Sequence, residues 1–297
     1  MPIPSGTFIH HVHLRVGNLD RAASFYQSTI GLTEISRSGA QALLSANGGL
    51  PAQLILSEMT DVRPRDPLSP GLFHVAWRVT DRHSLAKMIQ HFRDRRTRLQ
   101  GFADHGVSEA LYLSDPEGNG IEIYRDRPRE EWPTRDGKIE MMTEPLDIRG
   151  ILEELKNETA TGAPLDKGTT IGHIHLQVSD LGSARRFYHE NLGFDVAQDS
   201  FPGALFVSAG GYHHHIGLNT WNSQGSGPSR NDTPGLASFG VALPDQESLS
   251  TLLKRLTRES NKPASSGEDS YIVSDSDNLQ IELLHQPAIV SAPTMSR

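Results

Sequence analysis

The amino-acid sequence predicts an α+β fold made of four copies of one βαβββ module, in which a strand and a helix precede three further strands. The first observation behind this prediction is an internal repeat, because the segment 9–31 returns as 171–193 at a constant offset of 162 residues. The segment 115–122 returns in the same way as 275–282. The second observation is that each copy contains two halves with the same order of strand-like and helix-like patterns. The chain is therefore a duplication of a unit that is itself divided in two.

Module one opens with a strand of alternating apolar residues, after which Asn18 caps the start of a helix and Gly31 marks its end. The elements expected in this module are strand 8–16, helix 19–29 and strands 33–37, 41–45 and 53–57. Module two repeats the plan, with Asp81 as the cap of its helix. Its expected elements are strand 72–79, helix 82–95 and strands 98–102, 109–114 and 120–125. Modules three and four follow the same order.

The duplication divides the chain into two module pairs and a connector. The expected boundaries are 1–125 for the first pair (modules 8–62 and 72–125), 126–168 for the connector, 169–285 for the second pair (modules 171–221 and 236–285) and 286–297 for a loose tail. The connector begins with a charged, proline-broken stretch, contains one short amphipathic helix within 146–156 and ends in a flexible link. Because the connector is long, it leaves open which modules pair in space.

The composition argues against several classes of function. The chain has 297 residues, 36% of them hydrophobic, and a formal net charge of −8 without a long basic run, which disfavours nucleic acid and acidic membrane surfaces as partners. It contains no cysteine, which excludes disulfides, thiolate metal sites and cysteine nucleophiles. Neither a secretory signal nor an apolar run long enough to span a bilayer is visible. We therefore expect a cytoplasmic protein, with a homo-oligomer as one open possibility.

Histidine and glutamate recur at fixed positions of the repeat. His11, His74 and His173 lie on the first strands of modules one to three, whereas Ser238 takes this position in module four. Glu122 follows a Gly-rich turn on the fourth strand of module two, and its apolar neighbours place it on the opposite face of the sheet from them. Two histidines and one carboxylate suit a divalent first-row metal and leave coordination positions open.

A histidine on a strand is more often a structural or surface residue than a ligand. We interpret the following histidines in that way: His13, His83, His91, His189 and His285. His11, His74 and His173 differ because they recur at one position of the repeat, which favours the ligand interpretation. Glu122 has an alternative of its own, since a glutamate after a Gly-rich turn can simply face solvent.

The module order, the repeated opening pattern that ends in Phe-Tyr and Leu/Ile-Gly, and the Asp-Pro-Glu-Gly-Asn-Gly-Ile-Glu hairpin at 115–122 resemble the vicinal oxygen chelate superfamily. This superfamily includes glyoxalase I, fosfomycin and bleomycin resistance proteins, and type I extradiol ring-cleavage dioxygenases. The resemblance covers nearly the whole chain outside the connector and tail, and is closest to catechol-2,3-dioxygenase-like proteins of four modules. It implies that the modules form two half-open, barrel-like sheets.

The resemblance also implies a set of site residues. In extradiol dioxygenases of this type, iron(II) is held by two histidines on first strands and a glutamate on a fourth strand. Carried over, this implies His74, Glu122 and His173 as metal ligands, which requires modules two and three to pair. The conventional pairing of modules one and two would make His11 the third ligand instead. The implied catalytic residues, which move protons and bind the substrate hydroxyl, are His214, Tyr112 and His105.

The function implied is that of an Fe2+-dependent extradiol (catechol 2,3-type) dioxygenase of aromatic catabolism, acting on a small aromatic diol and dioxygen. Mn2+, Ni2+ and Zn2+ are the alternative metals. A glyoxalase-like lyase or isomerase is a second interpretation, although the glyoxalase pattern prefers a carboxylate where this chain has histidines at 213–215. A metal-free protein of the same fold that binds an aromatic or drug-like ligand is a third.

Overall fold

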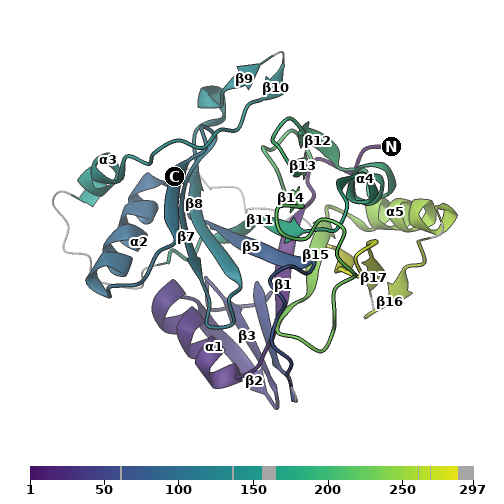
Figure 1. Ribbon diagram of the computed structural model, residues 1–297, viewed down its shortest axis with the longest axis horizontal. Helices are drawn as coiled ribbons and strands as arrows, with labels where there is room; N and C mark the ends of the chain where they lie inside the picture. The colour runs from purple at the N-terminus through teal and green to yellow at the C-terminus, as the bar shows by residue number, and fades with distance from the viewer. Residues whose placement is uncertain (61, 136, 156–164, 260, 268, 287–297) are drawn as a thin grey trace, which may run out of the picture.

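The computed structural model describes residues 1–60, 62–135, 137–155, 165–259, 261–267 and 269–286, and it contains the four βαβββ modules (Figure 1). Module one consists of β1 (Phe8–Val16), α1 (Leu19–Phe25), β2 (Thr33–Ser38), β3 (Gln41–Ser45) and β4 (Leu54–Glu58). Module two consists of β5 (Gly71–Arg78), α2 (Arg82–Asp94), β6 (Gly101–Asp104), β7 (Ser108–Ser114) and β8 (Gly120–Asp126). Module three consists of β11 (Thr170–Gln177), α4 (Leu181–Ala184), β12 (Asp195–Gln198), β13 (Ala204–Ser208) and β14 (Ile216–Asn219). Module four consists of β15 (Gly235–Leu243), α5 (Gln246–Arg258), β16 (Ala264–Ser265), β17 (Ser270–Ser274) and β18 (Gln280–His285).

The helices begin at the caps that the sequence predicts. Asn18 and Asp81 each accept a hydrogen bond of 2.7 Å from the backbone N–H three residues later. The end of the first helix differs from a regular α-helix, because α1 continues as a π-helical turn over Tyr26–Ile30. Gly31 then ends it with a φ of 99°, a conformation that glycine adopts without strain.

Two eight-stranded sheets hold the modules together, and each sheet is formed by two modules. Modules two and three form the inner sheet, in the order β12-β13-β14-β11-β5-β8-β7-β6. Modules one and four form the outer sheet, in the order β16-β17-β18-β15-β1-β4-β3-β2. In each sheet the two first strands pair antiparallel, β5 with β11 and β1 with β15. Modules one and two therefore share no sheet, and Figure 1 shows the helices around the outside of the curled strands.

Two equivalent tyrosine–aspartate hydrogen bonds join the inner and outer sheets. Tyr26 of module one donates to Asp115 of module two over 3.0 Å, and Tyr188 of module three donates to Asp275 of module four over the same distance. Each aspartate also accepts two backbone N–H groups of its own turn. Burial raises the pKa of Asp115, and it raises the pKa of Asp275 to about 6. The tyrosine hydroxyl and the backbone N–H groups act in the opposite direction and offset part of the cost of desolvating each carboxylate.

The connector is more structured than the sequence indicates, and its helix is shorter. The segment expected as one helix within 146–156 forms α3 (Ile148–Leu152) and a 3₁₀ turn at 153–155, and residue 156 lies outside the described residues. The helix starts late because Asp147 caps it, accepting the N–H of Gly150, a residue of low helix propensity. A short hairpin, β9 (Thr134–Arg135) and β10 (Lys138–Ile139), was not expected. The expected flexible link at 159–164 and residues 287–297 of the tail also lie outside the described ranges.

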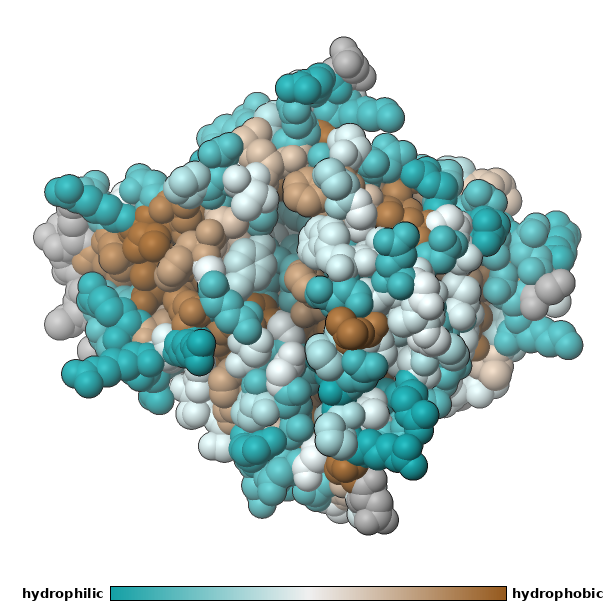
Figure 2. All heavy atoms as spheres, viewed as in Figure 1, coloured by the Kyte–Doolittle hydropathy of each residue, from teal (hydrophilic) through white to brown (hydrophobic). Residues whose placement is uncertain are grey.

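The connector packs on module two. Ile151 of α3 is fully buried, and Leu146, Ile148 and Leu152 pack half-buried against the core. Hydrophobic residues are visible between hydrophilic ones on the left of Figure 2, over α2 and α3. None of the helices in the described part of the chain is long and apolar enough to cross a membrane.

The tyrosine–aspartate pairs predict equal losses of stability in the two halves of the molecule. Tyr26→Phe and Tyr188→Phe should each lower the free energy of unfolding by about 1.5–3 kcal/mol, because a buried carboxylate loses a donor. Tyr271→Phe, at a half-buried tyrosine of β17, is the control and should cost less than about 0.5 kcal/mol. Urea unfolding followed by circular dichroism measures all three, and wild-type stability in both pair variants would show that these contacts do not hold the sheets together.

Candidate metal centre

Three neighbouring strands of the inner sheet bring His74, Glu122 and His173 together. Ala76 on β5 is paired with Glu122 on β8 and with His173 on β11, so its small side chain leaves space for the two larger ones. His74 lies two residues before Ala76 and therefore on the same face of the sheet. Gly120 is the neighbour of His74 in the β5–β8 pair, and a Cβ there would lie 2.0 Å from a backbone oxygen of β5.

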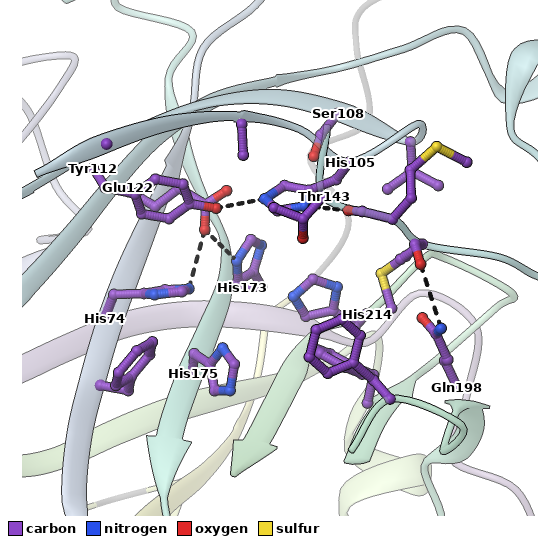
Figure 3. A pocket seen from close by; sticks show the side chains of 18 of the residues that line it. His74, His105, Ser108, Tyr112, Glu122, Thr143, His173, His175, Gln198 and His214 are labelled. Carbon is purple, nitrogen blue, oxygen red and sulfur yellow. Dashed lines mark hydrogen bonds and ion pairs between the residues drawn. The ribbon is translucent and has the colours of Figure 1, made fainter. Parts of the chain in front are cut away.

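The ligand atoms of these three residues converge on one carboxylate oxygen. The Nε2 atoms of His74 and His173 each lie 3.0 Å from Oε2 of Glu122 (Figure 3), and the three residues are 6%, 1% and 2% exposed respectively. Nε2 of His173 is aligned for a hydrogen bond to this oxygen, whereas Nε2 of His74, at the same distance, is not aligned for one and has no other partner among the described residues. Leaving a buried polar atom unpaired costs about 1–3 kcal/mol, a cost that a bound metal ion would remove.

The ionisation of the site favours metal binding. Burial alone would raise the pKa of the Glu122 carboxyl, but the neighbouring His173 and His74 hold that pKa well below its usual range. Burial lowers the pKa of His173 to about 4. Near pH 7 the carboxyl is therefore ionised and the imidazole of His173 is neutral, which are the forms in which both groups bind metal ions.

The separations between the ligand atoms fit a first-row divalent metal. Bonds of about 2.0–2.2 Å place adjacent ligand atoms about 3 Å apart, which is the distance found between each nitrogen and the carboxylate oxygen. The three ligand atoms all lie within 4.8 Å of one another, and no other group of three such residues occurs in the part of the chain that the structure describes. Three protein ligands leave the remaining coordination positions open.

The outer sheet carries an incomplete copy of this arrangement. Nε2 of His11 lies 3.2 Å from Oε2 of Glu282, and the register of β1, β15 and β18 matches that of β11, β5 and β8. Ser238 stands where His74 stands in the inner sheet, so the third ligand is missing. His11 does not complete the site at Glu122, because β1 pairs with β15 in the outer sheet rather than with β5.

A cavity of about 340 Å³ lies beside the three ligands (Figure 3). Its walls are mostly apolar, and Phe73, Phe206 and Trp221 contribute aromatic rings to them. The three residues that the resemblance implied as catalytic all line this cavity, namely Tyr112, His105 and His214. The inner sheet therefore gathers all six residues that the resemblance implied, three as metal ligands and three as catalytic residues, around one space.

Tyr112 and His105 form a chain of hydrogen bonds that ends on the connector. Nδ1 of His105 lies 2.7 Å from the backbone oxygen of Met142, and its Nε2 lies 2.6 Å from the hydroxyl of Tyr112. A carbonyl oxygen only accepts, so Nδ1 of neutral His105 carries the proton and Nε2 accepts from Tyr112. Burial and the charge of Glu122 raise the pKa of Tyr112 well above its usual value, so this side chain remains a phenol.

His214 is held by a second chain of hydrogen bonds, behind the cavity. Its Nδ1 lies 2.9 Å from Nδ1 of His213, whose Nε2 lies 2.9 Å from Oδ1 of Asp126. A carboxylate only accepts, so His213 donates through Nε2, and its Nδ1 then accepts the Nδ1–H of His214. His214 thus presents an unprotonated Nε2 on its other side. Burial, together with the neighbouring histidines, lowers the pKa of His214 well below its usual value.

The sequence missed several residues of the site, and two of them carried a detectable signal. His175 lines the cavity and was detectable because it alternates with His173 along one strand. Asp126 continues the alternation from Glu122 along β8, although its partner His213 is distant in sequence. Met141, Met142 and Thr143 reach the cavity from the connector, and no repeat or periodicity indicated them.

Known proteins resemble this chain over most of its length. The family model described as Glyoxalase/Bleomycin resistance protein/Dioxygenase superfamily matches residues 8–123 and 170–287. A catechol-2,3-dioxygenase of Bacillus subtilis (strain 168) is 41% identical over 280 residues, which cover 92% of this chain and 95% of that protein. A probable lactoylglutathione lyase of Synechocystis sp. is 26% identical over 130 residues, covering 42% of this chain and 99% of the relative.

A solved structure shows the same fold. A candidate dioxygenase from Bacillus subtilis subsp. subtilis str. 168 superposes with a TM-score of 0.65 at 11% sequence identity, covering 97% of this chain and 87% of that one. At this level of identity the likeness concerns the arrangement of the modules alone.

The site geometry predicts one metal ion per chain, bound in the inner sheet. His74→Ala, Glu122→Ala and His173→Ala should each weaken metal binding at least about 100-fold, because ligands contribute no less than the groups that orient them. At a metal concentration 100 times the dissociation constant, binding should raise the free energy of unfolding by about 2.7 kcal/mol, a gain that a chelator abolishes.

His11→Ala and Glu282→Ala are the matched controls, since they remove the equivalent residues of the outer sheet. Elemental analysis and metal titration of the five variants measure the result. Loss of metal in the outer-sheet variants, with retention in the inner-sheet ones, would contradict the assignment.

Proposed function

Because the chain belongs to the Glyoxalase/Bleomycin resistance protein/Dioxygenase superfamily, we propose that it is an Fe2+-dependent extradiol dioxygenase that cleaves the ring of a catechol-type diol. The observation that carries this proposal is the set of His74, Glu122 and His173 at the wall of an apolar cavity. Two histidines and one carboxylate with open positions are typical of non-haem iron(II) oxygenases. The 41% identity to a catechol-2,3-dioxygenase supports the same reaction.

The overall reaction balances without a further reductant. The diol and one dioxygen molecule combine, the ring carbon–carbon bond beside the two hydroxyls breaks, and both oxygen atoms remain in the ring-opened product. When bound, Fe2+ supplies the electron transfer between diol and dioxygen that this reaction requires. The contribution of the protein is to bind the diol, exclude water from it and move its protons.

His214 is suited to move those protons. Its Nε2 is free of hydrogen-bonded partners within the described residues, while its Nδ1–H is held by His213. A proton taken from a diol hydroxyl at Nε2 makes a short-lived imidazolium whose Nδ1–H remains hydrogen-bonded to His213, which Asp126 orients. The contacts from Asp126 to His213 and from His213 to His214 thus fix the tautomer of His214 before the substrate binds.

Tyr112 and His105 orient the diol from the opposite wall. The phenol of Tyr112 donates a hydrogen bond to His105, so its oxygen keeps lone pairs that can accept from a substrate hydroxyl. His105 is fixed in turn by the carbonyl of Met142. The two chains of hydrogen bonds thus assign an acceptor to each wall of the cavity, which suits a substrate that arrives with two hydroxyl protons.

The glyoxalase-like alternative has support in the similarity to a lactoylglutathione lyase, but the donor set disfavours it. The expected carboxylate near 213–215 is replaced by histidines, and His214 lines the cavity without a second glutamate beside it. A metal-free binding protein would leave Nε2 of His74 buried without an aligned hydrogen bond, which disfavours that alternative.

Metal identity and product decide between these functions. Protein loaded with Fe2+ under nitrogen, then exposed to catechol and ¹⁸O2, should consume about one dioxygen per diol and yield a ring-opened product with two labelled atoms. Turnover of the thiol adduct of a 2-oxoaldehyde with Ni2+ or Zn2+, without oxygen uptake, would favour the lyase. Tight binding of catechol without turnover under any metal would favour the binding protein.

The hydrogen-bond chain behind His214 predicts a tautomer-dependent loss of rate. His214→Asn should lower kcat by about 10²–10⁴-fold, the usual contribution of an acid–base residue. Asp126→Asn should also lower kcat strongly, because an amide can donate to His213 and so reverse the proton positions along the chain. Metal content should stay unchanged in both.

The control is His215→Asn, in the same histidine run but with its Nδ1 bonded to the backbone N–H of Ala209 and its side chain outside the cavity. It should keep the wild-type kcat per metal-loaded protein. Stopped-flow measurement of diol oxidation tests all three, and an unaffected kcat in Asp126→Asn would rule out the orienting role.

A further inference from the structure

The cavity is larger than a single aromatic ring requires. A dry apolar cavity of about 150 Å³ is enough to bind benzene, whereas the cavity beside the metal ligands measures about 340 Å³. A diol ring placed next to His74 and Glu122 therefore leaves a second region free. This region is bounded by the connector on one side and by the end of β12 on the other, as the positions of Thr143 and Gln198 in Figure 3 show.

The second region is apolar and carries no cation. Met141 and Met142 of the connector, Phe102 of β6 and Phe201 supply its apolar walls. Among the residues described by the structure, those that line the cavity include no lysine and no arginine. A carboxylate that leaves bulk water for this region would therefore lose part of its hydration without gaining a positively charged partner, which is unfavourable.

The polar group at the far side is neutral and has an unused acceptor. Gln198 is 8% exposed, and its Nε2 donates a long hydrogen bond of 3.5 Å to the backbone oxygen of Met141. Its Nε2 also lies 3.4 Å from Oγ of Ser200, and its Oε1 is buried without a hydrogen-bond partner in the described part of the chain, so a small rotation of this weakly held amide would turn Oε1 toward a ligand. An amide oxygen accepts from a neutral N–H or O–H group but repels an anionic oxygen.

We propose that the preferred substrate is an aromatic diol with an uncharged, mainly apolar ring substituent, which lies between Met141–Thr143 of the connector and Gln198. Diols that carry a carboxylate on the substituent are excluded. This inference rests on the proposed function, and it assigns the connector a direct role in substrate selection.

Arg65 is a cation beside the cavity that could oppose this inference. It lies at a neighbouring cavity of about 630 Å³, which shares the walls Phe73 and Tyr112 with the first. Its guanidinium already donates to the backbone oxygens of Leu72 and Gly118 and to Asn119. Arg65 is thus engaged with module two rather than free to bind a carboxylate.

The test compares diols of matched shape on the Fe2+-loaded wild-type protein. Ethylcatechol should exceed catechol in kcat/KM by about tenfold, as expected from burying two further carbon groups. Dihydroxybenzamide should exceed dihydroxybenzoate at least about 100-fold, because the two differ in charge and hardly in shape. The 3- and 4-substituted isomers are both measured, and calorimetry under nitrogen gives their dissociation constants without turnover.

Two variants test where the substituent lies. Gln198→Lys adds a cation and should lower the ratio of kcat/KM for dihydroxybenzamide to that for dihydroxybenzoate at least about tenfold. The uncharged Gln198→Met should retain a strong preference for dihydroxybenzamide. Equal kcat/KM values for dihydroxybenzamide and dihydroxybenzoate in the wild type would overturn the inference. A preference of the wild type for dihydroxybenzoate that disappears in Arg65→Met would overturn it as well. Absence of cleavage for every diol, catechol included, would instead refute the proposed function.

Discussion

The contact on which the site depends is the meeting of two imidazole nitrogens at one oxygen of Glu122. His74 and His173 come from different copies of the duplicated unit, and they meet only because β5 pairs antiparallel with β11. That pairing places Ala76 between Glu122 and His173, so a shift of one residue would turn the histidine of β11 to the opposite face. The candidate metal centre therefore depends on the interface between the two copies rather than on either copy alone.

The connector follows from the same pairing. The strands that it joins, β8 and β11, both belong to the inner sheet, which a much shorter link could connect. Its additional length runs along the cavity, where the backbone of Met142 fixes His105 and Met141–Thr143 form part of the wall. A segment that looks like a linker in the sequence thus orients one polar residue and contributes to the surface that a substrate would contact.

The sequence predicted the modules and the helix caps Asn18 and Asp81 because these features repeat within the chain, and the resemblance implied His74, Glu122 and His173 as metal ligands, with His11 as the alternative to His173. His74 and Glu122 belong to the site under either module pairing. The third ligand could not be derived from spacing, since the choice between His11 and His173 depends on contacts between strands that are distant in sequence. Asp126 and Met142 were not predicted because their partners are distant in sequence, namely Tyr212 and His213 for Asp126 and His105 for Met142.

The duplication produced two sheets with similar arrangements of strands. They differ in the burial of the glutamate as well as in the residue at the position of His74 or Ser238. The side chain of Glu122 is 3% exposed, whereas that of Glu282, at the equivalent position, is 24% exposed. A carboxylate that retains water can be solvated without a metal, so the contact between the buried His11 and the partly exposed Glu282 does not require one. The inner carboxylate has no such solvent, and two imidazoles at one oxygen satisfy it incompletely. The same fold thus favours a metal ion in one sheet and tolerates Ser238 in the other.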